Sequence, residues 1–300
     1  MVQHTSGDYH AGFACFVGRP NAGKSTLTNA IVGQKIAITS AKPQTTRHTV
    51  RGVVHRPDAQ LVLVDTPGLH RPRTLLGERL NDLVRATWSE TDVIGLCLPA
   101  DEAIGPGDRF ISSEIAALKA KLIAVVTKTD LVDKRHLAER LLAVQDLGDF
   151  VDIVPVSAVS GEQVETLVDV MIGHLPSSPQ LYPEGMITDE PEHVLMAELI
   201  REAALEGVRD ELPHSIAVLV EEVIPGEDGA ATKVFADIYV ERSSQKAIVI
   251  GHRASRLKDV GIRARREIED LLGARVYLDL HVRVAKDWQR DPKQLRRLGF

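Results

Sequence analysis

The chain has 300 residues, of which 44% are hydrophobic and 26% charged, and its formal net charge is −6. This ordinary composition predicts a globular protein of about two domains and excludes a uniformly basic nucleic-acid coat. No apolar run reaches the length of a membrane-spanning helix, and residues 1–13 lack the basic and apolar regions of a signal peptide. Cys15 and Cys97 lie far apart in apolar runs, so we expect core residues in a reducing compartment.

The first half alternates short apolar runs with helix-like stretches. We expect strands at 13–17, 61–64, 93–98, 122–127 and 153–156. We expect helices at 25–32, 75–88, 108–118, 137–147 and 164–175. This order predicts an α/β domain with a mostly parallel sheet and helices on both faces. Right-handed crossovers then place the loops after the strands along one sheet edge, where ligands bind.

The segment LPSSPQLYPEG at 175–185 interrupts this rhythm and predicts a linker. After it we expect helices at 194–212, 253–272 and 292–298, and strands at 215–223, 233–241, 247–250 and 276–284. This second pattern predicts an α+β domain. The expected divisions are an N-terminal tail at 1–12, a first domain at 13–178, a linker at 179–190, a second domain at 191–285 and a tail at 286–300.

The segment GRPNAGKST at 18–26 matches the phosphate-binding pattern G-x-x-x-x-G-K-[ST], between an expected strand and an expected helix. Gly18 and Gly23 let the backbone curl around a β-phosphate, and Lys24 supplies a charge for the β- and γ-phosphates. Ser25 offers a hydroxyl to Mg²⁺, and the helix N-terminus favours an anion. The segment therefore predicts a nucleotide site.

The segment VDTPGL at 64–69 follows the next expected strand. Asp65 suits a position that holds Mg²⁺ directly or through water, and the Gly68 amide suits a contact to the γ-phosphate. Taken alone, D-T-P-G also fits an ordinary turn. Its place at a strand end after a phosphate loop favours the nucleotide interpretation.

Two more segments at strand ends point to guanine. In TKTD at 127–130, Asp130 accepts two N–H groups that guanine has and adenine lacks, and Lys128 covers the base. In VSA at 156–158, the Ala158 amide suits the guanine O6. Four such segments in this order predict a guanine-nucleotide domain.

The second domain contains a basic stretch, because seven Lys and Arg residues and a single acid lie between 246 and 266. Within it, the loop GHRA at 251–254 stands where a KH domain has G-x-x-G, and the second glycine is replaced by Ala254. A basic helix is often only a solvated face, but after a glycine turn it favours a surface that tracks nucleic-acid phosphates. Trp288 either stacks on a base or is buried, and burial is the favoured alternative.

The sequence also resembles a known family beyond these motifs. The segments QKIAITSAKPQTTRH and VDTPGLH resemble the two switch regions of the Era family, in the TrmE-Era-EngA-like, translation-factor class of P-loop GTPases. The segments DELPHSIAV and RRLGF resemble the C-terminal half of that family. The resemblance covers nearly all of the chain after the first dozen residues, and it implies a GTPase domain followed by a type II KH domain.

The resemblance implies a switch that slowly hydrolyses GTP to GDP and phosphate and that binds RNA. Era-family proteins bind the 3′ end of small-subunit (16S) ribosomal RNA and assist maturation of the 30S subunit. They also associate peripherally with the inner face of the cell membrane. We therefore expect a cytoplasmic monomer with these partners.

The same resemblance implies specific residues. The expected nucleotide-binding residues are Gly18, Arg19, Pro20, Asn21, Ala22, Gly23, Lys24, Ser25, Thr26, Asp65, Thr66, Pro67, Gly68, Leu69, Thr127, Lys128, Thr129, Asp130, Ser157 and Ala158. The expected Mg²⁺ ligands are Ser25, Asp65 and either Thr45 or Thr46. The expected catalytic residues are Lys24, Asn21 and Gly68. The expected RNA contacts are Gly251, His252, Arg253, Ala254, Arg256, Lys258 and Arg263.

Two positions depart from the family pattern. Thr127 replaces an Asn that ties the base loop to the phosphate loop, so we expect preserved GTP specificity with weaker binding. Ala254 adds a methyl group where the loop meets the sugar-phosphate chain, so we expect RNA binding with a steeper salt dependence and weaker sequence discrimination.

The sequence lacks the glutamine that assists GTP hydrolysis in many GTPases. Leu69 stands where many GTPases have a Gln that orients the attacking water, and this predicts slow turnover without help. Asn21 matches an Asn that holds K⁺ in related GTPases, where the cation lowers the transition-state charge. The alternative, in which Asn21 only shapes the loop, fits equally well.

Three rival functions are compatible with parts of the sequence. A small-molecule kinase or ATPase shares the phosphate loop, but Asp130 and Ala158 speak against adenine. An RNA- or membrane-binding module with an inert nucleotide domain conflicts with intact Lys24, Ser25 and Asp65. A GTPase that works in membrane-associated or cell-cycle signalling, with a degenerate KH loop, is the third.

Overall fold

The computed structural model describes residues 9–39, 45–69, 72, 74–208, 212–227 and 230–300. The chain divides into two compact units, each described here by itself. The first contains 1–37, 46–70 and 80–189, and the second contains 38–45, 71–79 and 190–300.

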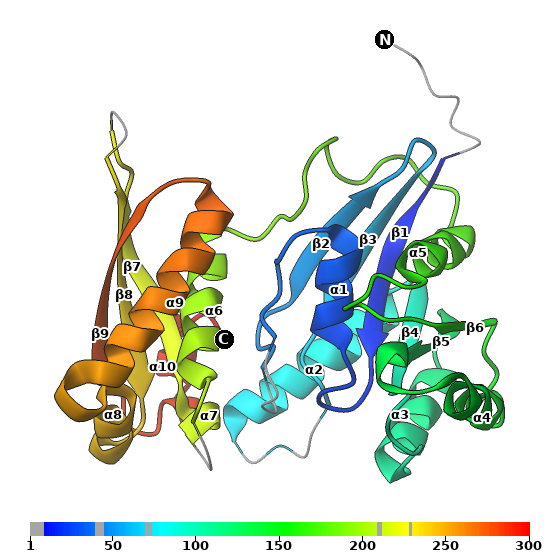
Figure 1. Ribbon diagram of the computed structural model, residues 1–300, viewed down its shortest axis with the longest axis horizontal. Helices are drawn as coiled ribbons and strands as arrows, with labels where there is room; N and C mark the ends of the chain where they lie inside the picture. Colours follow the sequence, from blue (N-terminus) through cyan, green and yellow to red (C-terminus); the bar gives the residue numbers. More distant parts are fainter. Residues whose placement is uncertain (1–8, 40–44, 70–71, 73, 209–211, 228–229) are drawn as a thin grey trace. The chain divides into compact units, whose positions relative to one another are not determined.

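The first unit is built on a six-stranded sheet with the strand order β2-β3-β1-β4-β5-β6, in which only the β2–β3 pair is antiparallel (Figure 1). Its strands are β1 His10–Val17, β2 Val50–His55, β3 Ala59–Asp65, β4 Val93–Pro99, β5 Lys121–Thr127 and β6 Asp152–Pro155. Its helices are α1 Lys24–Val32, α2 Leu75–Glu90, α3 Pro106–Ala116, α4 Lys134–Gln145 and α5 Val164–Gly173, with a short 3₁₀ turn, η1, at Thr129–Leu131. Of α2, residues 80–90 belong to this unit and 75–79 to the second. The predicted α/β class is confirmed.

Alternation along the strands creates two cores, one on each face of this sheet. Ala14 and Phe16 pack with side chains of α1 and α5 on one face. Cys15 and Val17 pack with side chains of α2, α3 and α4 on the other, among them Trp88. Both cysteines are free thiols with no exposed surface, so the prediction that they are core residues is confirmed.

The second unit is an α+β domain with the strand order β7-β8-β9, antiparallel between β7 and β8 and parallel between β8 and β9. Its strands are β7 Ala217–Ile224, β8 Thr232–Val240 and β9 Val276–Val284. Its helices are α6 Glu192–Leu205, α7 Leu212–Ser215, α8 Ser243–Ile250, α9 Ser255–Leu272 and α10 Pro292–Arg297, and two 3₁₀ turns are η2 His252–Ala254 and η3 Trp288–Arg290. Helices α6 and α9 lie together against one face of the sheet (Figure 1) and share one core with it.

Two elements differ from the sequence prediction. The predicted strand at 247–250 is wrong, because Ser243–Ile250 forms helix α8. Its start is fixed by Gln245, whose side-chain oxygen accepts the backbone N–H groups of Glu241 and Arg242. Strand β2 was missed because its apolar run is broken by Arg51 and Gly52. A side chain at Gly52 would come within 2.5 Å of Val32, so the break allows α1 to approach the strand closely.

Trp288 is fully buried, and its indole N–H donates a 3.0 Å hydrogen bond to the Ser215 carbonyl. Its ring also stacks on Phe300, with centroids 5.8 Å apart. Burial was the favoured alternative and is confirmed. Among the described helices, none has the length and apolarity to cross a membrane.

Candidate functional site

The phosphate loop joins β1 to α1 in the predicted way. Gly23 caps α1 with a left-handed backbone (φ 89°) and has no side chain to occupy the first N–H groups of the helix, which leaves those donors for an anion. The ammonium of Lys24 donates to the carbonyls of Gly18 and Arg19 at 3.1 and 2.9 Å. Burial lowers the pKa of Lys24. A Cβ on Gly68 would lie 3.7 Å from this ammonium, so Gly68 and Lys24 face the same space.

Ser25, Thr46 and Asp65 converge beside this loop. The Ser25 hydroxyl donates to Asp65 Oδ2 at 2.9 Å, and Thr46 Oγ1 lies 3.2 Å from the same oxygen and 3.1 Å from Ser25 Oγ. Of the two threonines predicted as ligands, the structure brings Thr46 into this cluster. Thr45 belongs to the second unit, where its carbonyl accepts a hydrogen bond from Arg201.

The chemistry of this cluster fits a hard cation. Asp65 Oδ1 is buried and has no hydrogen-bond partner within the described residues. Burial raises the pKa of Asp65 to about 6, against the opposing effects of Ser25, Lys24 and Thr46. A Mg²⁺ ion would satisfy the orphaned oxygen and favour the ionised carboxylate. Nowhere among the described residues do three or more His, Cys, Asp or Glu side chains form a group that could hold a metal ion.

A cavity of about 220 Å³ lies beyond the phosphate loop at the ends of β5 and β6. It is lined by Gly23, Thr26, Leu27, Thr127, Lys128, Asp130, Leu131, Val156, Ala158 and Val159. The Ser157 hydroxyl donates a 2.6 Å hydrogen bond to Asp130 Oδ1 and so orients the carboxylate. Asp130 itself is exposed. A purine in the cavity would cover it.

The remaining residues of the predicted site lie in the same loops. Thr66 and Thr129 are buried, whereas Pro20 and Asn21 are exposed. Asn21 has a left-handed backbone (φ 63°), which suits a residue that shapes the loop and leaves its predicted K⁺ role open.

The GHRA loop joins α8 to α9. Gly251 has φ 74°, and two non-glycine residues, Arg253 and Ala254, also have left-handed backbones with φ 49° and 60°. His252, Arg253 and Lys258 are exposed, as a contact surface for RNA requires. Left-handed backbone at two residues that carry a Cβ strains this loop.

Two of the predicted RNA contacts have partners inside the domain. Arg256 donates to the carbonyls of Ala204 and Glu206, at 3.0 and 2.8 Å, at the end of α6. Arg263 forms an ion pair with Glu206. These cations stabilise the C-terminal end of α6 and are less free for RNA than the sequence indicated.

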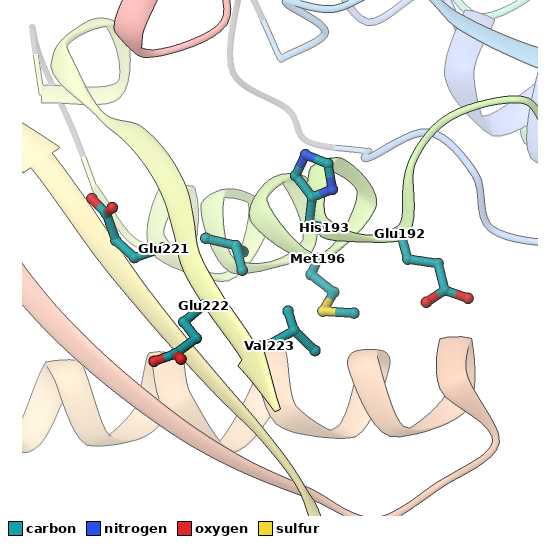
Figure 2. Close-up of a pocket in the computed structure, with 7 residues that line it drawn as sticks. Glu192, His193, Met196, Glu221, Glu222 and Val223 are labelled. Carbon is teal, nitrogen blue, oxygen red and sulfur yellow. The ribbon is translucent and has the colours of Figure 1, made fainter. Parts of the chain in front are cut away.

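A second pocket, of about 580 Å³, lies between α6 and β7 (Figure 2). It is lined by Glu192, His193, Met196, Val220, Glu221, Glu222 and Val223. Its three carboxylates would repel phosphates, so this pocket does not suit an RNA backbone.

Sequence reasoning missed three acids of the first unit, Asp101, Glu102 and Asp108. They form ion pairs with Arg19 of the phosphate loop and Lys128 of the base loop. No local motif marks them, because their partners are far away in the sequence.

Comparisons with known proteins agree with this geometry. A family model described as a 50S ribosome-binding GTPase matches residues 13–128, and a KH-domain model matches residues 211–289. The chain is 68% identical to the GTPase Era of Streptomyces coelicolor, covering 97% of this chain and 95% of that protein. It is 64% identical to the GTPase Era of Mycolicibacterium smegmatis, covering 98% and 99%.

Solved structures give the same result. An Era structure in complex with MgGDPNP and nucleotides 1506–1542 of 16S ribosomal RNA matches with a TM-score of 0.91 at 37% identity, covering 97% of this chain and 99% of that chain. An Aquifex aeolicus Era variant bound to GDP and AlF4⁻ matches with a TM-score of 0.92 at 37% identity, with the same coverage.

Proposed function

The chain belongs to the Era family of GTPases, and on that basis we propose that the four loops described above form its GTP site. The chain is a GTPase with a C-terminal KH domain. The rival interpretations as an ATP-using kinase or as an inert nucleotide domain are therefore wrong. The observation that carries the site is the joint presence, at one sheet edge, of the Ser25–Thr46–Asp65 cluster and the Asp130 cavity.

Each residue has a distinct role in the proposed reaction. The N–H groups that begin α1 and the Lys24 ammonium bind the β- and γ-phosphates, where negative charge moves during transfer. Ser25, Thr46 and Asp65 would hold Mg²⁺, which when bound neutralises phosphate charge. A water oxygen bonds to the γ-phosphorus while the bond between that phosphorus and the β–γ bridging oxygen breaks. The proton that the water loses ends on the released phosphate, and the products are GDP and phosphate. Leu69 has no group to orient that water, so unassisted turnover is slow.

Asn21 is proposed to hold a K⁺ ion near the phosphates, where it would lower the charge that builds up in the transition state. The test is turnover in KCl against NaCl at equal ionic strength, with Asn21→Ala as the second protein. We expect faster turnover in K⁺ for the wild type and no difference for the variant. Equal turnover of the wild type in both salts would contradict the proposal that Asn21 holds K⁺.

The base specificity is tested by Asp130→Asn. The Asn amide N–H repels the guanine N–H groups but donates to the 2-oxo group of xanthine, so GDP affinity should fall at least about tenfold and XDP affinity should rise. Calorimetry with GDP, XDP and ADP measures the change, and Asp169→Asn on the exposed face of α5 is the matched control. Equal wild-type affinity for GDP and ADP would refute the site.

RNA is the proposed partner of the KH unit, specifically the 3′ end of 16S ribosomal RNA, because a solved Era relative is bound to nucleotides 1506–1542 of that RNA. His252, Arg253 and Lys258 give the GHRA loop an exposed basic surface. Arg253→Gln with Lys258→Gln should weaken binding of a single-stranded RNA of this sequence and reduce its salt slope by about two. Lys233→Gln, which changes an exposed residue of β8, is the control that should change neither the affinity nor the salt slope.

The cellular role follows from this partner. We propose that the protein assists maturation of the 30S subunit as a cytoplasmic monomer that associates peripherally with the inner membrane face. Depletion should then cause unprocessed small-subunit RNA to accumulate. The specific alternative is membrane-associated or cell-cycle signalling, motivated by the altered GHRA loop. Normal RNA processing in the depleted cells would favour that alternative.

A further inference from the structure

Arg19, the second residue of the phosphate loop, forms ion pairs with two acids, Asp108 and Glu102. Its Nε donates a 2.7 Å hydrogen bond to Asp108 Oδ1, and its Nη2 lies 3.1 Å from Glu102 Oε2. The Asp108 side chain is 1% exposed and also accepts the Gly105 N–H at the start of α3. Burial alone would lower the pKa of Arg19, but the hydrogen bonds and charges of Asp108 and Glu102 raise it.

Lys128 in the base loop faces the same segment. Its ammonium lies 3.8 Å from Asp101 Oδ1 and 3.9 Å from Glu102 Oε1. The two oxygens of the Glu102 carboxylate therefore pair with two different cations, Arg19 in the phosphate loop and Lys128 in the base loop. Within the first unit, this side chain connects the two halves of the nucleotide site.

The sheet order explains why Glu102 occupies this place. Strand β4 lies between β1, which leads into the phosphate loop, and β5, which leads into the base loop. Because the three strands are parallel, the segment after β4 emerges between those two loops. Asp101 and Glu102 are the second and third residues after that strand ends at Pro99.

We propose that Glu102 is a positioning residue for guanine nucleotides, which acts through Lys128 and Arg19 and slows nucleotide release. This inference rests on the proposed nucleotide site. The Glu102 carboxylate holds the ammonium of Lys128, so that the hydrocarbon stem of Lys128 lies over the base cavity. Together with Asp108 of α3, it also holds the Arg19 guanidinium, which keeps this cation from rearranging beside the phosphates. The pairs are partly exposed, so the effect should be moderate and sensitive to salt.

The test is the dissociation rate of mant-GDP, a fluorescent GDP analogue, from the full chain in Mg²⁺ buffer. Glu102→Gln keeps the size of the side chain and removes its charge, and we expect release about two to five times faster, as for one partly exposed ion pair. Raising the salt concentration should accelerate release from the wild type more than from the variant. Glu139→Gln, which breaks the exposed Arg135–Glu139 pair on α4, is the control and should leave the rate unchanged.

A double-variant cycle separates positioning from general loosening. In a Lys128→Met background, Glu102→Gln should accelerate release by a smaller factor than in the wild type, because one partner of the carboxylate is gone. Undiminished acceleration in that background, or equal release from the wild type and Glu102→Gln, would overturn the inference. Failure of the wild type to bind mant-GDP at all would instead refute the proposed nucleotide site.

Discussion

Thr127 Oγ1 donates a buried 2.8 Å hydrogen bond to the carbonyl oxygen of Ala22 and so joins the base loop to the phosphate loop. The resemblance to the family implies an Asn for this tie, and the Thr127 hydroxyl makes it here. The bond runs from the last residue of β5 to the residue before the cap of α1. One hydroxyl thus links the part of the site that binds phosphate to the part that binds the base.

Thr127→Val keeps the shape of this side chain and removes the donor. The Ala22 carbonyl then lacks its partner, so we expect GDP affinity to fall about 2- to 12-fold, the range for one neutral hydrogen bond. Thr127→Asn should bind GDP more tightly than the wild type, because its amide reaches both the carbonyl and the purine. Calorimetry measures both, and Thr166→Val, at an exposed position of α5, is the control. An unchanged affinity for Thr127→Val would show that the tie is not needed.

Asp65→Asn should stabilise the metal-free, nucleotide-free protein. The folded-state pKa of Asp65 is raised from 3.8 to about 6, so the folded chain holds its proton more tightly than the unfolded chain. The free energy of unfolding therefore falls as the pH rises from about 4 to 6 and stays lower above that range. At pH 7.5 in EDTA, the variant should be more stable by about 1–3 kcal/mol.

Urea unfolding at pH 7.5 measures this difference. Added MgGTP should stabilise the wild type and leave the variant nearly unchanged, because Asn cannot balance the charge of the cation. Equal stability of the two proteins in EDTA would show that ionising the buried Asp65 carboxyl does not lower the free energy of unfolding.

Ala254→Gly should stabilise the KH unit. Ala254 has φ 60°, a left-handed conformation that costs a residue with a Cβ about 1 kcal/mol more than glycine. We therefore expect the unfolding free energy to rise by about 1 kcal/mol, less a few tenths for the greater freedom of the unfolded chain. Ala247→Gly inside helix α8 is the opposing control and should destabilise by a similar amount.

The same variant tests how closely the loop holds RNA. Without the methyl group, the backbone approaches the sugar-phosphate chain more closely, so affinity and sequence discrimination should both increase in filter binding. Unchanged affinity and unchanged selectivity would count against a backbone contact at this residue.

Trp288→Ala should strongly destabilise the second unit. The side chain is fully buried, stacks on Phe300 and donates to Ser215, so its removal leaves a large cavity and removes this hydrogen bond. We expect a loss of about 3–5 kcal/mol by chemical denaturation. Trp288→Phe should lose less, because the stacking survives. A loss under about 1 kcal/mol for the alanine variant would contradict this packing role.

The sequence predicted the parts of this protein that depend on neighbouring residues. The phosphate loop and the strand ends at Asp65, Thr127 and Ser157 are set by short local patterns, and the structure brings them to one edge. Features that depend on distant partners were missed or misread. Helix α8 was taken for a strand because four apolar residues fit both elements, and the cap from Gln245 decides between them. The partners of Arg19 and Arg256 lie about ninety and fifty positions away, and no periodicity marks such pairs.

The two tryptophans of the chain fall in different units, Trp88 in the first and Trp288 in the second, and both are buried. Their surroundings differ, because the Trp288 indole N–H donates to a carbonyl whereas that of Trp88 has no partner among the described residues. Each unit thus contains one tryptophan, whose fluorescence reports on that unit. In Trp88→Phe the remaining fluorescence follows the KH unit, and in Trp288→Phe it follows the GTPase unit. The unfolding of each part can then be monitored in the intact chain.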